Sequence, residues 1–176
     1  STRSTAASPL GTSSSKIETA APPVPKKVVQ TLSSRPFAPT SRTVPNLYYK
    51  RFNVKGWSRP NKGDVAMVQI DVSFLPTGNG PYLSTDQHFK AWPMQAFAVA
   101  VLAAAKAVQY DPRYLRVHLT IPIGTILHAD LQVDGPSAGG VQAVAVAAAL
   151  LGDSIRPDVC MSGTIDMNLV VGLVGG

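Results

Sequence analysis

The segment Ser137–Leu151 constrains the fold of this chain most strongly, because it is apolar on nearly every side. It consists almost wholly of Ala, Val and Leu, so few polar residues would fall on any face of a helix. A helix of this kind has to be buried on most sides. Gly152 follows it and suits the left-handed position that ends many helices. The chain is therefore predicted to pack other elements around this helix.

Alternating apolar and polar residues predict strands around this helix. The clearest alternation lies within residues 65–74, where Val68, Ile70, Val72 and Phe74 would share one face. Three further strands are expected at 115–123, 159–162 and 167–174.

A second helix is predicted over residues 86–109 from their helical periodicity. Pro93 conflicts with a helix interior and is therefore expected in the first turn. The resulting order of strand, helix, strand, helix, strand, strand predicts an α/β or α+β fold with a sheet and helices in layers. The expected buried face of this helix comprises Trp92, Ala96, Val99, Ala103 and Val108.

A serine motif, Asp134–Gly139, opens the apolar helix with the sequence Asp-Gly-Pro-Ser-Ala-Gly. Serine is a favoured N-cap residue, and the glycines allow a sharp turn, so Ser137 could serve only as a helix cap. The same position also suits a nucleophile, since free backbone N–H groups at a helix start can stabilise an oxyanion. The motif alone leaves both interpretations open.

Residues 63–176 resemble the proteolytic domain of the Lon protease family. The serine motif Asp134–Gly139 carries the resemblance first, and the match continues without a gap to the last residue. The resemblance implies a Lon-like layered sheet with helices. Further matching elements are Leu151-Gly152, Arg156, Asp158-Val159, Met161-Ser162-Gly163, Ile165 and Val174-Gly175-Gly176.

That family uses a serine nucleophile and a lysine base, and the lysine is desolvated so that it is neutral. The resemblance implies that Ser137 is the nucleophile and that the hydroxyl of Ser162 orients the lysine. It also implies that N–H groups near Ser137 are the oxyanion donors. In the family the lysine lies just beyond the double glycine, which here is Gly175-Gly176.

Several positions depart from the family pattern. The lysine position lies outside this sequence, and Thr164 stands where the family has an acid. Beyond residue 62 the lysines are Lys90 and Lys106, both expected on a solvated helix face. His118 could act as a base in principle, as could His128 with Asp130 in a Ser–His–Asp arrangement, although a histidine on a strand is more often a packing residue. Two smaller departures are Leu169 in place of a glycine and Pro122-Ile123-Gly124 in place of Pro-Glu-Gly.

Charge divides the chain near residue 62. Residues 1–62 hold 11 of the 16 Lys and Arg and one acid, Glu18, whereas residues 63–176 carry a net charge of −4. The first part is also rich in Pro, Ser and Thr and is predicted to be an extended basic arm. Such an arm suits an anionic partner, such as RNA, anionic lipid or an acidic protein face.

The end of the arm mixes aromatic residues with cations. This mixture is typical of RNA contact through stacking and phosphate binding. Contact to other protein subunits alone, with the aromatics packed and the cations in water, is the other interpretation, and the mixture leaves both open. The predicted partner contacts are Tyr48, Tyr49, Lys50, Arg51, Lys55, Trp57 and Arg59.

The remaining features bear on the compartment and cofactors. The first residues are rich in Ser, Thr and Arg and lack acids, as in an organellar transit peptide, so a mitochondrial location is expected.

The single cysteine, Cys160, excludes a disulfide framework within the sequence and is expected to be buried. No apolar stretch approaches the ~20 residues of a membrane span, so a soluble or peripheral protein is expected. Neither a metal-binding cluster nor a phosphate-binding loop is present, and no cofactor is predicted.

These observations lead to two hypotheses about function. The first is a non-catalytic, Lon-like structural subunit of a large organellar assembly, such as a ribosome or a respiratory or ATP synthase complex. The absence of the lysine from this sequence and the basic arm both favour it. The alternative is an ATP-independent Ser–Lys peptidase with Ser137 as nucleophile, completed by a second chain.

Overall fold

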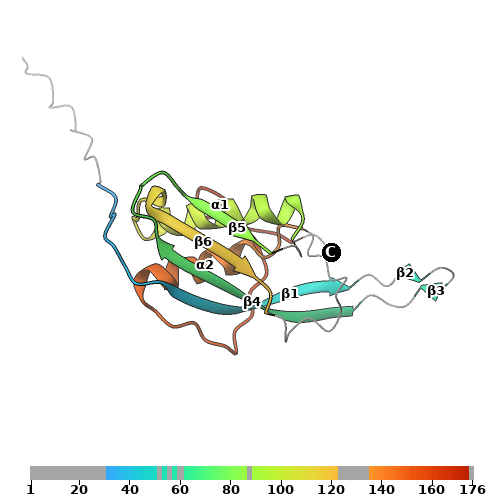
Figure 1. Ribbon diagram of the computed structural model, residues 1–176. Coiled ribbons are helices and arrows are strands. Elements are labelled where there is room, and N and C mark those ends of the chain that lie inside the picture. The colour runs from blue at the N-terminus through green and yellow to red at the C-terminus, as the bar shows by residue number, and fades with distance from the viewer. Residues whose placement is uncertain are drawn as a thin grey trace, which may run out of the picture. The chain divides into compact units, whose positions relative to one another are not determined.

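A four-stranded sheet forms the centre of the fold, with the strand order β1-β4-β6-β5 (Figure 1). The pairs β1–β4 and β4–β6 are antiparallel, and β6–β5 is parallel. The computed structural model describes residues 31–50, 53–54, 57–58, 62–86, 89–122 and 135–174. The strands of the sheet are β1 (Thr40–Lys50), β4 (Lys62–Phe74), β5 (Tyr82–Thr85) and β6 (Leu115–Thr120).

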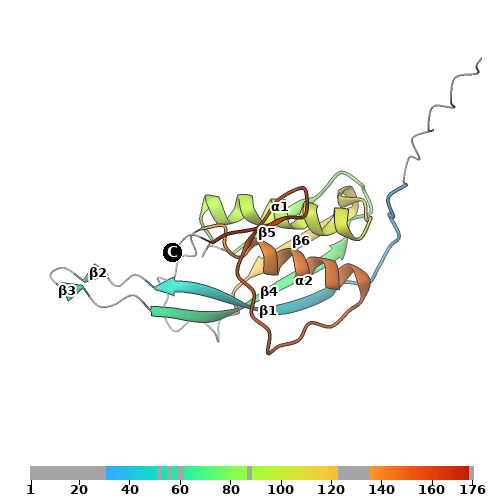
Figure 2. The same cartoon turned by 180° about the vertical axis from the view of Figure 1, so that it is seen from behind.

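Two helices, α1 (Ala91–Ala107) and α2 (Gly139–Leu151), cover one face of this sheet (Figures 1 and 2). α2 packs against α1, β1 and β4. Since successive strand residues point to opposite faces, every second residue of β4 and β6 enters the layer beneath the helices. The side chains buried there from the sheet are Val44, Val68, Ile70, Val72, Leu115, Val117 and Leu119.

The predicted α/β layer arrangement is confirmed, and so is the burial of the apolar helix. Nine residues of α2 are buried, and Gly152 ends the helix in the left-handed conformation at φ 77°. The expected first-turn position of Pro93 is also confirmed, since α1 begins at Ala91. The serine motif itself precedes α2, because the helix starts at Gly139.

The predicted strand at 159–162 is wrong. Those residues form no strand, and the half-buried β7 (Thr164–Ile165) pairs with β8 (Val171–Gly172) instead. Cys160, expected to be buried, is exposed. An apolar run becomes a buried strand only where a sheet edge is available to pair with it, and here the run has no such partner among the described residues.

The predicted buried face of α1 needs a correction. Ala103 is buried as predicted, but Trp92 is 59% exposed. The helix also turns Phe97, Ala100, Val101 and Ala104 into the core. Nearly all residues of α1 are apolar, so the sequence pattern did not define a single face. Contact with the sheet and with α2 sets the rotation of the helix.

Residues 31–37 lie against the end of α1, within the segment predicted to be an arm. The N–H of Ser33 donates to the carbonyl of Gln109 at 2.8 Å, and its carbonyl accepts from the N–H of Asp111 at 2.7 Å. The ring of Phe37 packs edge-to-face on Phe74 and Tyr110. The division of the chain at residue 62 stays a prediction, but β1 and this segment are part of the folded structure.

Candidate active site

Ser137 lies in the turn that leads into α2. Gly139 N–H donates to the carbonyl of Pro136 at 3.0 Å, and Ala138 occupies the N-cap position. The Ser137 side chain is half-buried, and its hydroxyl has no hydrogen bond to another described residue. The interpretation of Ser137 as a capping serine is therefore wrong, and its hydroxyl is left available for other chemistry.

A pair of backbone hydrogen bonds joins the serine motif to the segment before β7. Gly163 N–H donates to the carbonyl of Ser137 at 2.7 Å, and Gly140 N–H donates to the carbonyl of Gly163 at 2.8 Å. Gly163 is buried, and a Cβ at Gly140 would lie 3.2 Å from its carbonyl oxygen. The two segments therefore fit together only with small residues at these positions.

This pairing also places Ser162 near the serine motif. Ser162 directly precedes Gly163, whose N–H binds the carbonyl of Ser137. Ser162 is exposed, as a residue at the edge of the site would be. The structure thus places the two predicted site serines on neighbouring segments. Their catalytic roles stay predictions, and Asp134, the first residue of the serine motif, lies outside the described residues.

Backbone donors are available beside Ser137. The N–H of Ala138 makes no hydrogen bond to another described residue, and it lies at the positive end of the α2 dipole. Free N–H groups at a helix start are suited to a developing negative charge. The geometry is thus compatible with an oxyanion site at the N–H of Ala138.

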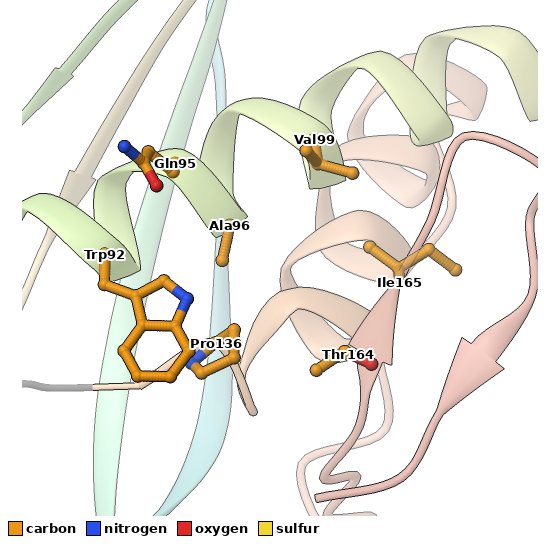
Figure 3. A pocket seen from close by; sticks show the side chains of 7 residues that line it. All are labelled: Trp92, Gln95, Ala96, Val99, Pro136, Thr164 and Ile165. Carbon is orange, nitrogen blue, oxygen red and sulfur yellow. The ribbon is translucent and has the colours of Figure 1, made fainter.

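A shallow pocket of about 220 Å³ opens beside the serine motif (Figure 3). Pro136, the neighbour of Ser137, forms one wall, and Thr164 and Ile165 of β7 form another. The described lining has no charged side chain. Thr164, which stands where the family has an acid, contributes a neutral hydroxyl to this lining. The remaining walls come from α1, namely Trp92, Gln95, Ala96 and Val99.

The sequence carries a signal for this pocket in the spacing of residues on α1. Trp92, Gln95, Ala96 and Val99 have the spacing of one helix face. Trp92, Ala96 and Val99 are predicted to enter the core, whereas they line an open pocket together with Gln95. Whether this helix face enters the core or lines a pocket is decided only by the tertiary contact of α1 with β7 and the serine motif.

The two lysines of the helical region do not fit the role of a base. Lys106 is exposed, and its Nζ donates to the carbonyl of Met167 at 2.6 Å. Lys90 directly precedes α1 and is also exposed. A lysine base has to be desolvated to lose its proton near neutral pH. Their prediction as solvated residues is confirmed.

His118 cannot serve as the base for Ser137. Its neighbours Val117 and Leu119 point under the helices, so His118 lies on the opposite face of the sheet from α2. There its Nδ1 is 2.9 Å from Oγ of Ser84. His128 and Asp130 lie outside the described residues.

The predicted partner contacts of the arm are described only in part. Tyr48, Tyr49 and Lys50 belong to β1 and Trp57 to β3 (Trp57–Ser58), each described by its backbone. Arg51, Lys55 and Arg59 lie outside the described residues.

Among the described residues, no group of three or more His, Cys, Asp or Glu could hold a metal ion. No described helix is both long enough and apolar enough to cross a bilayer.

The layered sheet with two helices and the serine motif before α2 are what the resemblance to the Lon proteolytic domain leads us to expect. Residues 83–176 match the family of the Lon protease (S16) C-terminal proteolytic domain, and the chain belongs to this family. The resemblance of the motifs is thereby confirmed.

Two curated relatives match about two thirds of the chain. Lon protease 1 of Sorangium cellulosum is 32% identical over 119 residues, or 65% of this chain and 14% of the relative. Lon protease of Lawsonia intracellularis is 31% identical over 122 residues, or 66% of this chain and 14% of the relative. The matched part of the chain thus spans about one seventh of each relative.

Proposed function

We propose that this domain is the nucleophile-bearing part of a Lon-family serine peptidase, with Ser137 as the attacking residue. The observation that carries the proposal is the pair of hydrogen bonds between the serine motif and Gly163. It fixes the backbone of Ser137 at the start of a buried helix while its hydroxyl stays without a partner among the described residues. A nucleophile needs this combination of a rigid backbone and a free hydroxyl.

The proposed reaction is acyl transfer from a peptide bond. Ser137 Oγ attacks the carbonyl carbon, its proton passes to a base, and the carbonyl oxygen becomes negative near the N–H of Ala138. Collapse breaks the C–N bond as the base returns the proton to the leaving amine. Water then hydrolyses the acyl-enzyme by the same route. The base is a neutral lysine supplied by polypeptide outside residues 1–176.

The pocket suggests which side chain the substrate presents. Its neutral lining would make a charged substrate group lose hydration without a counter-charge, which is unfavourable. Its volume of about 220 Å³ is below the roughly 300–1,000 Å³ of pockets for drug-sized ligands. A single uncharged side chain next to the cleaved bond fits this size and polarity.

A second candidate is a non-catalytic subunit of a large mitochondrial assembly, which a separate observation favours. The segment around β8 exposes apolar side chains, with Leu173 96% exposed and Val170 and Val171 more than half exposed. Exposed apolar side chains of this kind are typical of a contact with another polypeptide. A neighbouring subunit of an assembly would provide that contact, and so would the lysine-bearing polypeptide of the first candidate. Thr164 in place of the acid of the family also agrees with a lost activity.

A serine-reactive fluorophosphonate probe distinguishes these candidates. The protein would be labelled in its native complex, and the modified residue would be identified by mass spectrometry. The peptidase proposal expects a covalent adduct on Ser137 and its loss in Ser137→Ala. Ser73→Ala is the matched control, because Ser73 is also half-buried but lies on β4, away from the motif.

Absence of labelling in a native complex that retains all its subunits would reject the peptidase. Size fractionation of that complex then tests the second candidate. A large mitochondrial particle that forms equally well with Ser137→Ala would support it, and a free protein outside mitochondria would reject it.

A further inference from the structure

A second pocket opens where the start of β1 lies beside the C-terminal end of α2 (Figures 1 and 2). It has a volume of about 260 Å³ and is lined by residues 41–43 of β1 and residues 152–155, which follow α2. Ser137 lies at the other end of α2, and the 13 residues of this helix set its two ends about 20 Å apart. The pocket is therefore separate from the candidate active site.

Arg42 supplies a fixed positive charge in this pocket. It is half-buried, and three hydrogen bonds of 2.8 Å hold its guanidinium in place. Nε donates to the carbonyl of Asp153, and Nη1 donates to Oγ1 of Thr40 and to the carbonyl of Ser41. A guanidinium has five N–H donors, so the two on Nη2 are without a partner among the described residues. A cation held in this way loses little further side-chain freedom when it binds an anionic group.

Asp153 adds a negative charge to the same pocket without neutralising Arg42. The hydrogen bond between the two residues goes to the main-chain carbonyl of Asp153, and no described carboxylate lies within ion-pair distance of the guanidinium. The Asp153 side chain is exposed and makes no hydrogen bond to a described residue. A pocket with two opposite charges that do not pair with each other is suited to a ligand that carries both.

Polar groups and one aliphatic side chain complete the described lining. The hydroxyls of Thr43 and Ser154 make no hydrogen bond to another described residue. Such hydroxyls can accept from an ammonium group or donate to a carboxylate. The half-buried side chain of Ile155 offers contact to a short hydrocarbon.

We propose that this pocket binds the zwitterion of a small aliphatic α-amino acid. The carboxylate of the ligand binds Nη2 of Arg42, its ammonium group binds the carboxylate of Asp153, and its side chain contacts Ile155. A phosphate is disfavoured by the charge of Asp153 and by the carbonyl end of α2, and a simple amine is disfavoured by Arg42. The volume of about 260 Å³ is below the roughly 300–1,000 Å³ of pockets for drug-sized ligands, as expected for a ligand of this size.

A purely structural role for Arg42 explains less of the geometry. A cation near the end of α2 offsets the negative end of the helix dipole, and the bond to the Asp153 carbonyl fits that role. It does not explain the two unused donors on Nη2 or the unpaired carboxylate of Asp153. Arg42→Lys separates the two roles, because it keeps the charge beside α2 but lacks the planar set of donors.

The test is calorimetric titration of the full chain with L-leucine and three related probes. L-leucinamide lacks the carboxylate, isocaproate lacks the ammonium group, and inorganic phosphate is an anion of another shape. We expect saturable binding of L-leucine and at least about tenfold weaker binding of each other probe, which corresponds to the loss of one charged hydrogen bond. Ser137→Ala should bind L-leucine as the native protein does, since the pocket does not depend on the chemistry of Ser137.

Two variants of the pocket have matched controls in the loop after α2. Asp153→Asn and Arg42→Lys should each weaken the binding of L-leucine by about tenfold or more. Asp158→Asn and Arg156→Lys make the same substitutions in an exposed ion pair outside the pocket and should change the affinity by less than about threefold. Circular dichroism checks that each variant is folded. The series of probes on the native protein tests the proposal even if Arg42→Lys unfolds.

Four results would overturn the proposal. The first is the absence of saturable binding of L-leucine up to about 10 mM. The second is binding of isocaproate or phosphate as tight as that of L-leucine, which indicates a plain anion site. The third is undiminished binding by Arg42→Lys and Asp153→Asn, which leaves Arg42 with its structural role alone. The fourth is an equal loss in the pocket variants and their controls, which indicates a nonspecific effect.

Discussion

The backbone N–H of Gly163 donates to the carbonyl oxygen of Ser137 at 2.7 Å, across 26 positions of sequence. Through this bond the segment before β7 holds the turn that carries the candidate nucleophile. The carbonyl of Gly163 in turn accepts from Gly140 in the first turn of α2. The position of Ser137 thus depends on a residue outside its own motif.

Gly163→Ala should disturb this contact. The added Cβ would lie 2.7 Å from Cγ1 of Val171, which is closer than carbon atoms approach. We expect a loss of about 1–3 kcal/mol in the free energy of unfolding, measured by urea denaturation, and slower labelling of Ser137. The second change Val171→Ala removes the clashing methyl and should recover part of the loss. Purely additive effects of the two substitutions would contradict this account.

Gln142→Met should stabilise the domain. Gln142 is buried in α2, and its Oε1 has no hydrogen-bond partner among the described residues. Methionine has a similar volume and leaves no unsatisfied polar atom, so a gain of about 1 kcal/mol in the free energy of unfolding is expected. Gln142→Glu, which buries a charge instead, should be strongly destabilising. A loss of stability in Gln142→Met would mean that residues outside the described part bind this amide.

Asp111 should make stability depend on pH in the acidic range. Its hydrogen bonds from the Arg113 side chain hold the pKa of the carboxyl below the ordinary value of 3.8. A lowered folded-state pKa adds stability above pH 3.8, and that stability is lost as the pH falls through the folded-state pKa. Asp111→Asn should cost about 1 kcal/mol at pH 7 and less below pH 4, as measured by chemical denaturation.

Asp158→Asn is the control for this pH effect. Asp158 forms an ion pair with Arg156 at the same 2.6 Å, but its side chain is 62% exposed, against 11% for Asp111. Exposed pairs of this kind contribute little to stability. A pH profile that changes equally in both variants would show that burial of Asp111 is not the cause.

Phe37→Ala tests whether the segment before β1 belongs to the folded domain. The ring contacts Phe74 and Tyr110 edge-to-face, so its loss should cost about 2 kcal/mol in the free energy of unfolding. Leu32→Ala in the same segment is the control, because Leu32 is exposed and should change stability by less than about 0.5 kcal/mol. Thermal unfolding of both variants, compared with the native protein, measures the difference. Equal stability of all three would place Phe37 outside the core.

The sequence determined those parts of the protein that depend on local chemistry. The all-apolar composition of residues 139–151 requires a buried helix, and Gly152 can adopt the positive φ that ends it. Alternation in β4 and β6 likewise assigns Val68, Ile70 and Val117 to the core. The serine motif and the family were readable because their residues are contiguous.

The tertiary structure decided what depends on contacts between distant segments. Pairing with β4 makes a strand of residues 40–50, whose local composition resembles an arm. Packing of α1 sets Trp92 beside a pocket instead of in the core, since a helix with apolar residues all around has no preferred rotation of its own. The hydrogen bond between Gly163 and Ser137 has the same origin. Register and helix rotation follow from the packing of whole surfaces, and no local stretch of sequence contains that information.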